Sequence, residues 1–153
     1  SPYRWAESLT GLKFVDLGEA AAPCLRALAR GEVVILYGDL DYFPDGRTLP
    51  FFGVPFPPPH GPARLALAAG APILPVYAVI EGGRVRFECD GPVETAEAAQ
   101  EDIERRLLES MERWIARFPE HWFIFRDAWD LAGNAVRNRR QLHYVRLMRD
   151  ISW

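Results

Sequence analysis

The sequence has few cysteines, little net charge and no long apolar run, and each absence excludes a class of protein. Cys24 and Cys89 are the two cysteines, far apart and without a C-x-x-C spacing. We therefore expect a reduced, cytosolic compartment. We also expect no metal and no cofactor. The formal net charge of -3 gives no general reason to expect a nucleic-acid partner. No apolar run reaches the roughly 18 residues of a transmembrane helix, and no signal peptide is evident, so we expect a soluble protein or one on a membrane surface.

What the sequence contains is typical of a single globular domain. Its 153 residues are 49% hydrophobic and 25% charged, which is enough apolar surface for a core. Strands are predicted at 12–18, 32–38, 71–80 and 81–90, and helices at 19–31, 61–70 and 95–118. This order predicts an α/β fold, a mixed sheet flanked by helices.

Glycine positions and the spacing of apolar residues indicate where these predicted helices and strands begin and end. Gly31 and Gly70 are plausible helix ends, and the glycine pair at 82–83 predicts a hairpin turn. Apolar residues at helical spacing give the helix at 95–118 one apolar face, with Thr95 as a reasonable cap.

A stiff, apolar loop follows the run 32–38, which is continuous and β-branched, as in a central strand covered on both faces. Seven of the 13 prolines lie between Asp41 and Pro62, so the loop is rigid and largely outside any ladder. The aromatic residues of this loop are Tyr42, Phe43, Phe51, Phe52 and Phe56. In open α/β sheets, ligands bind beyond the carboxyl ends of strands. An apolar wall beside Asp39 and Asp41 would suit an amphiphile with an apolar chain and a polar head.

Two other interpretations of this loop stay open. It is also typical of a proline-rich loop that covers one end of the core. The run PFPPPHGP at 55–62 could be a polyproline ligand for an aromatic groove, although it is embedded between predicted elements.

Several motifs follow one another in the order found in a known family. They are D-x-D at 39–41, P-F-F-G-x-P at 50–55, G-x-A-x-L-A at 61–66, G-A-x-x-x-P at 70–75 and F-P-E-x-W at 118–122. Over roughly residues 12 to 130, the sequence resembles the second half of the bacterial lipid A late acyltransferases. It is similar too to their relatives that acylate phosphatidylinositol mannosides. Phe118 stands where that family has a histidine.

The resemblance implies an enzyme that moves a fatty acyl chain from a thioester to a hydroxyl of a membrane glycolipid. Acyl carrier protein or acyl-CoA would be the donor. The implied fold is glycerol-phosphate-acyltransferase-like and lacks its N-terminal part, with residues 1–130 as the C-terminal part of the α/β domain. The implied location is the cytoplasmic face of the inner (cell) membrane, as a peripheral protein.

The sequence departs from the family in its catalytic motif. The family uses H-x-x-x-x-D/E, whose histidine acts as general base and whose carboxylate orients it. None of His60, His121 and His143 is followed by a carboxylate at that spacing. In the family, the motif lies upstream of the part that this sequence resembles. We therefore expect part of an enzyme without its base, so that this chain alone is inactive, or a non-catalytic remnant that binds lipid or a partner.

A second departure is FPDGR at 43–47. It is one residue shorter than the F-P-E-G-x-R block of glycerol-phosphate acyltransferases. The alignment through the motifs at 39–41 and 50–55 is better, so we treat this similarity as chance.

The candidate substrate-binding residues are Asp39, Asp41, Arg47, Phe51, Phe52, Gly53, His60, Gly61 and Arg64. The carboxylates would anchor the acceptor head group or an arginine on the catalytic side. The arginines would contact a phosphate on the acceptor or on the acyl carrier, and the phenylalanines would contact an apolar chain. The glycines would allow close backbone approach or unusual φ values, and the histidine would face the site. The structural alternatives are turn chemistry for the aspartates, solvated surface for the arginines, core for the phenylalanines, and a cap or surface role for the histidine.

The tail at 131–153 is predicted to be basic and amphipathic. Within 136–153, five arginines stand against the single acid Asp150, a formal charge of +4, so the rest of the chain is correspondingly acidic. A helix with one apolar and one basic side would suit peripheral contact with an anionic membrane. Docking of this helix on the acidic body is the alternative.

Overall fold

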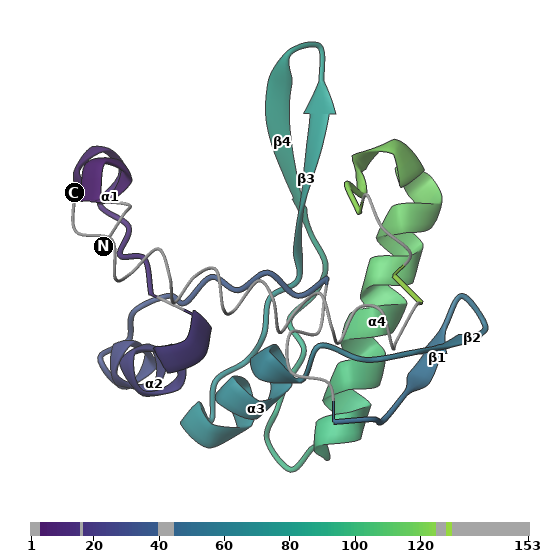
Figure 1. Ribbon diagram of the computed structural model, residues 1–153, viewed down its shortest axis with the longest axis horizontal. Helices are drawn as coiled ribbons and strands as arrows, with labels where there is room; N and C mark the ends of the chain where they lie inside the picture. Colours follow the sequence, from purple (N-terminus) through teal and green to yellow (C-terminus); the bar gives the residue numbers. More distant parts are fainter. Residues whose placement is uncertain (1–3, 16, 40–44, 125–127, 130–153) are drawn as a thin grey trace. The chain divides into compact units, whose positions relative to one another are not determined.

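The computed structural model describes residues 4–15, 17–39, 45–124 and 128–129. They fall into two compact units, Ser1–Val34 and Ile35–Trp153. Asp41 and the tail at 131–153 lie outside the described residues, so the predicted division at residue 130 stays a prediction. Figure 1 shows the helices and strands with their labels.

The first unit is helical. Helix α1 spans Arg4–Thr10, a 3-10 turn spans Leu17–Glu19 and helix α2 spans Ala21–Ala29. The helix predicted at 19–31 is confirmed as α2, and Gly31 follows its end with a φ of 75°. The strand predicted at 12–18 is wrong. The backbone N–H of Phe14 donates to the side chain of Glu7 at 3.0 Å, so a local bond replaces the strand ladder there.

The second unit holds hairpins and helices. Its elements are β1 (Leu49–Phe51), β2 (Val54–Phe56), α3 (His60–Ala69), β3 (Val76–Glu81), β4 (Arg84–Cys89), α4 (Gln100–Arg117) and a 3-10 turn (Pro119–His121). Strands β1 and β2 form one antiparallel sheet, and β3 and β4 form another. Small antiparallel sheets flanked by helices confirm the predicted α/β class (Figure 1).

The hairpin predicted around the glycine pair is confirmed as β3–β4. Gly82 and Gly83 form its turn with φ values of 56° and 74°, which glycine adopts without a steric penalty. Strand β3 begins later than predicted, at Val76. Pro72 and Pro75 lack the backbone donor that a ladder needs, and the segment before Val76 makes a single bridge, between Ile73 and Val93.

The motif P-F-F-G-x-P forms a second, shorter hairpin that the sequence pattern did not predict. Phe52 and Gly53 make its turn with φ values of 49° and 74°. A positive φ is costly for a residue with a side chain, so the structure must hold Phe52 in place. Its backbone N–H donates to the carboxylate of Glu112 on α4, and its ring is 45% exposed.

Helix α4 carries the main hydrophobic core of the second unit. The core residues are Leu49, Phe51, Phe56, Val79, Leu108, Met111, Trp114, Ile115 and Ala128. A smaller cluster joins Ala63 of α3 to Val93 and to Ile103 of α4. The helix predicted at 95–118 is therefore confirmed as α4, and its predicted apolar face is buried in the core. Its predicted cap is wrong, because the Thr95 hydroxyl donates to the carbonyl oxygen of Ala71 at 3.0 Å instead.

The central strand predicted at 32–38 is wrong. Within the part of the chain that the structure describes, this run forms no strand, and all its residues but Val34 are exposed, Val33 by 88% and Tyr37 by 87%. A strand needs a neighbour for its backbone N–H and C=O groups, and β-branched composition does not supply one. None of the described helices is both long enough and apolar enough to cross a lipid bilayer.

Candidate functional site

His60 lies at the start of α3, buried between two carboxylates. Its side chain is 3% exposed. The Nδ1 atom lies 2.7 Å from Oε1 of Glu104, and Nε2 lies 2.9 Å from Oδ1 of Asp45. Arg47 and Arg64 also bind the Asp45 carboxylate. We call these five residues the His60 cluster.

Proline and helix packing direct His60 into the interior. Pro59 precedes it with an extended backbone (φ -69°, ψ 103°), and its ring fixes φ at the entry to α3. One turn farther along, Ala63 is buried against Ile103 of α4. This contact brings the start of α3 to the first turns of α4, where Glu104 lies next to Ile103.

Glu104 is the innermost acid of the His60 cluster, and its side chain is fully buried. Its Oε1 accepts hydrogen bonds from His60 and from Nε2 of Gln100, the latter at 2.6 Å, and Nη2 of Arg47 lies 3.6 Å away. Its Oε2 has no hydrogen-bond partner among the described residues. A buried carboxylate requires a compensating charge and hydrogen-bond donors; Arg47 supplies the charge, and His60 and Gln100 lie within hydrogen-bond distance.

Both ring nitrogens of His60 lie within hydrogen-bond distance of a carboxylate oxygen, Nδ1 of that of Glu104 and Nε2 of that of Asp45. Nη2 of Arg47 also lies 3.1 Å from Nδ1 of His60. Because Arg47 also pairs with the carboxylates of Asp45 and Glu104, we attribute its position to these two acids. With both nitrogens occupied, His60 is not poised to take a proton from a substrate hydroxyl. This geometry fits a structural clamp better than a general base.

Asp45 ties the preceding loop to α3. Its carboxylate accepts hydrogen bonds from the backbone N–H and Nε of Arg47 at 3.0 and 3.1 Å, and from Nη2 of Arg64 at 3.1 Å. Burial opposes ionisation of this carboxyl group. The hydrogen bonds from Arg47 and the nearby charge of His60 outweigh it and lower the pKa of Asp45 to about 2.

The free energy of unfolding should therefore fall at acidic pH, because the carboxylate of Asp45 becomes protonated. The folded-state pKa is depressed from 3.8, so the carboxylate stabilises the fold above that value. This stabilisation is lost as the pH falls from about 5 to 2. In urea unfolding experiments across this range, the free energy of unfolding should fall less steeply with decreasing pH for Asp45→Asn than for the wild type. Asp102→Asn is the control, because Asp102 is exposed and pairs with Arg105 on the surface. An unchanged slope in Asp45→Asn would contradict the assignment.

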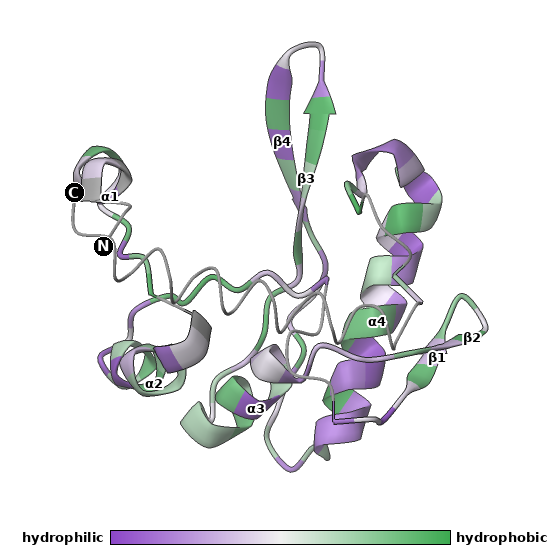
Figure 2. Cartoon of the chain, viewed as in Figure 1, coloured by the Kyte–Doolittle hydropathy of each residue, from purple (hydrophilic) through white to green (hydrophobic). Residues whose placement is uncertain are grey.

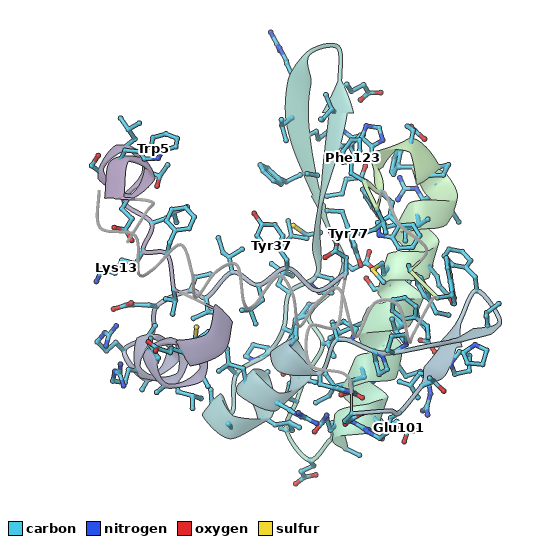
Figure 3. All side chains as sticks on the ribbon, viewed as in Figure 1. Trp5, Lys13, Tyr37, Tyr77, Glu101 and Phe123 are labelled. Atoms are coloured by element: carbon cyan, nitrogen blue, oxygen red, sulfur yellow. The ribbon has the colours of Figure 1, made fainter. Side chains whose placement is uncertain are left out.

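A second polar cluster joins the β3–β4 hairpin to α4; its Tyr77 is labelled in Figure 3. The hydroxyl of Tyr77 lies 2.6 Å from Oγ of Ser110, which donates to Oδ2 of Asp90 at 2.5 Å. Arg113 donates to the same oxygen at 2.9 Å. Burial raises the pKa of Tyr77, and the hydrogen bond from Ser110 lowers the pKa of Asp90. Because the Tyr77 ring also stacks on Trp114, we assign this cluster to packing.

The structure brings some of the predicted substrate-binding residues together and separates others. Arg47, His60 and Arg64 converge on Asp45. Phe51 is fully buried in the core, whereas Phe52 is exposed at the turn between β1 and β2. The sequence pattern had treated these two residues as one apolar wall.

The remaining predicted residues are less informative. Gly53 has the positive φ expected of a functional glycine, whereas Gly61 has neither a positive φ nor a close neighbour at its Cβ position. Asp39 is half-buried, and Asp41 lies outside the described residues. A substrate-binding role for any of the nine stays a prediction.

Sequence reasoning missed two acids of the His60 cluster. Asp45 lies in FPDGR, the stretch whose similarity we treated as chance. Glu104 lies on the apolar face of α4 beside Ile103 and one turn before Leu108, and all three are buried. An acid on an apolar helix face is rarely buried without a partner, and this is the signal that could have identified it.

Comparison with known proteins places the chain in a family. Residues 6–130 match the family model described as bacterial lipid A biosynthesis acyltransferase. The chain is 30% identical over 142 residues to a phosphatidylinositol mannoside acyltransferase of Mycobacterium tuberculosis (strain ATCC 25618 / H37Rv), a match that covers 90% of this chain and 44% of the relative. It is 26% identical over 129 residues to a phosphatidylinositol mannoside acyltransferase of Mycolicibacterium smegmatis. This match covers 82% of this chain and 42% of the relative.

The chain thus spans less than half the length of the curated relatives it matches. The matched region includes every motif on which the resemblance rested, from D-x-D at 39–41 to F-P-E-x-W at 118–122. The chain belongs to the bacterial lipid A biosynthesis acyltransferase family.

Proposed function

We propose that this chain is part of an acyltransferase that moves a fatty acyl chain from an acyl thioester to a hydroxyl of a membrane glycolipid. The family match over residues 6–130 carries the proposal. The names of the curated relatives, phosphatidylinositol mannoside acyltransferases, support a glycolipid acceptor. In this reaction the acyl carbon exchanges its bond to sulfur for a bond to the hydroxyl oxygen. The hydroxyl proton ends on the released thiol of acyl carrier protein or coenzyme A.

Arg47 and Arg64 are suited to the anionic part of a substrate. Both guanidinium groups are exposed, and both are held by the Asp45 carboxylate. Each guanidinium has five N–H donors, of which Asp45 takes only some, so donors remain for a phosphate on the acceptor or on the acyl carrier. Because Asp45 already orders these long side chains, less conformational entropy is lost when a phosphate binds.

Phe52 is the aromatic residue of the P-F-F-G-x-P motif that is available to an apolar chain. Its ring is exposed at the turn, where Glu112 holds its backbone, whereas Phe51 lies in the core beneath it. We assign to Phe52 contact with the acyl chain, and to Asp39 and Asp41 the polar head group of the acceptor.

The chain alone should not turn over, because the H-x-x-x-x-D/E motif is missing and His60 is engaged by two carboxylates. A general base typically supplies roughly 10²–10⁴-fold in rate. We expect the purified chain, mixed with acyl thioester and phosphatidylinositol mannoside, to release thiol at the background rate. Adding the part of the H37Rv relative that lies outside the match, which should carry the motif, is expected to start thiol release.

Two outcomes would contradict this account. Clear thiol release by the chain alone that disappears in His60→Ala would make His60 the base. The second outcome is that the two polypeptides together release no thiol although circular dichroism shows that both are folded. This result would favour the alternative, a non-catalytic remnant that binds lipid or a partner.

We further propose peripheral contact with an anionic membrane, at the cytoplasmic face of the inner membrane, through residues 136–153. Their formal charge of +4 supports this, since each basic group near an anionic surface contributes about 1 kcal/mol. The chain should sediment with anionic vesicles more than with neutral ones, and removal of residues 136–153 should abolish the difference. Equal binding to both vesicle types would reject the tail as a membrane contact.

A further inference from the structure

The turn between β1 and β2 carries an exposed aromatic residue in a strained backbone conformation. Phe52 and Gly53 are its two central residues, with φ values of 49° and 74°. Positive φ at both positions is the pattern of a type I′ turn, whose first central residue is typically asparagine, aspartate or glycine. Phenylalanine at this position costs free energy, so the formation of the turn does not explain it.

Packing of the core does not explain Phe52 either. Its ring is 45% exposed, and Val54, just after the turn, is 48% exposed. Phe51 fills the core position next to it, with a ring centroid 4.8 Å from that of Phe52. A Cβ atom at Gly53 would meet none of the described atoms within 4 Å, so close packing does not force the turn into its shape. Strained residues of this kind cluster at sites that contact ligands.

Glu112 of α4 holds the turn. Its carboxylate accepts a hydrogen bond from the backbone N–H of Phe52, which lies 60 positions away in the sequence. Leu108 and Ile115, one helical turn to either side, are buried in the core and fix this stretch of α4. Figure 2 shows that α4 alternates hydrophilic and hydrophobic residues, and Glu112 is one of the hydrophilic ones. Among the described residues it makes no ion pair, and a charged acceptor forms a hydrogen bond roughly twice as strong as a neutral one.

We propose that Glu112 is a positioning residue for the acyl chain: its carboxylate locks the β1–β2 turn so that the Phe52 ring stays outward, against that chain. The inference rests on the proposed function, which supplies the acyl chain. A phenyl ring offers apolar surface and no hydrogen-bonding group, so it suits the methylene groups of the chain and not a sugar or phosphate. A ring that is held in place before the chain arrives loses less conformational entropy on binding.

Nuclear magnetic resonance of the isotope-labelled chain tests the lock. In Glu112→Ala the backbone amide proton of Phe52 should exchange with solvent about tenfold faster than in the wild type, because its acceptor is removed. Glu112→Gln should keep most of the protection, since its amide oxygen still accepts a hydrogen bond. Glu109→Ala is the control from an exposed position on the same helix and should leave the exchange rate unchanged. Equal exchange in Glu112→Ala and the wild type would overturn the proposal.

Palmitoyl-coenzyme A, titrated without any acceptor, tests the contact with the acyl chain. The amide signals of Phe52 and Gly53 should shift, whereas acetyl-coenzyme A at the same concentrations should leave them in place. Measured from the Gly53 signal, the affinity for palmitoyl-coenzyme A should fall about tenfold in Phe52→Ala, because apolar contact surface is lost. It should fall about threefold in Glu112→Ala, because the ring is no longer held. Glu112→Gln and Glu109→Ala should change it by less than about twofold.

The double variant separates positioning from a general structural effect. If Glu112 acts through the Phe52 ring, Glu112→Ala should weaken binding no further once Phe52→Ala is present. Lower stability alone would reduce the folded fraction and leave unchanged the affinity that signals of the folded molecules report. An equal effect of Glu112→Ala with and without the ring would overturn the proposal, as would palmitoyl-coenzyme A that shifts neither Phe52 nor Gly53. Because these measurements need no turnover, failure of the proposed reaction is a separate result, seen as the absence of acylated glycolipid.

Discussion

Phe51→Ala should lower the free energy of unfolding by about 3–5 kcal/mol, the usual cost of removing a large aromatic side chain from a core. Phe51 has no exposed surface. Its ring centroid lies 4.7 Å from that of Phe56, 5.9 Å from that of Trp122 and 5.8 Å from that of Trp129. Alanine would leave a cavity among rigid rings that collapse poorly into it. Urea unfolding followed by tryptophan fluorescence and by circular dichroism would measure the loss.

Phe52 offers a matched control one residue away. Because its ring is exposed, Phe52→Ala should change the free energy of unfolding by no more than about 1 kcal/mol. Phe52→Gly should be neutral or slightly stabilising, since glycine adopts the φ of 49° without strain. If Phe52 contacts the acyl chain, both variants should lower acyl transfer in the reconstituted enzyme. Equal destabilisation by Phe51→Ala and Phe52→Ala would refute the separation of the pair into core and surface.

Glu104→Gln is expected to destabilise the fold by about 3–5 kcal/mol, because it removes a fully buried carboxylate that pairs with Arg47 and contacts His60. His60 and Arg47 would then face an amide, and Asp45 would be the one carboxylate left in the His60 cluster. Glu101→Gln is the control from the same helix, since Glu101 is exposed and pairs with Arg105 on the surface. Figure 3 shows Glu101 at the N-terminal end of α4.

The control should have little measurable effect, as is usual for surface ion pairs. A double-mutant cycle with His60→Gln should give a coupling energy, because the two side chains are in direct contact. If Glu104→Gln and Glu101→Gln had equally small effects, Glu104 would be hydrated in solution, and the His60 cluster would not hold the loop.

The elements that the sequence predicted well are those with local signals. Helix α3 ends at Gly70 with a φ of 62°, and the β3–β4 turn uses two glycines with positive φ values. The apolar periodicity of α4 appears directly in the buried Ile103, Leu108, Met111, Trp114 and Ile115. Capping chemistry and periodicity depend on a few neighbouring residues, so one sequence is enough to recognise them.

The run 32–38 shows where this reasoning fails. Its composition predicts a buried strand, yet strand formation depends on neighbours that no local pattern specifies. Prediction of the candidate site from the sequence fails for the same reason. His60 was recognisable as a candidate, but its partner Glu104 is 44 positions away. Their meeting depends on how Ala63 and Ile103 pack α3 against α4.

The central claim is that this chain serves acyl transfer to a glycolipid, and the product of the reaction tests it most directly. Acyl thioester with a labelled acyl chain would be incubated with phosphatidylinositol mannoside, the chain and the part of the H37Rv relative outside the match. The lipids would then be extracted and analysed by mass spectrometry. Thiol release alone does not separate transfer from hydrolysis, whereas the mass of the acceptor does. We predict a glycolipid heavier by one acyl chain, with the label in it. Label recovered only as free fatty acid, or only as unreacted thioester, would contradict the account.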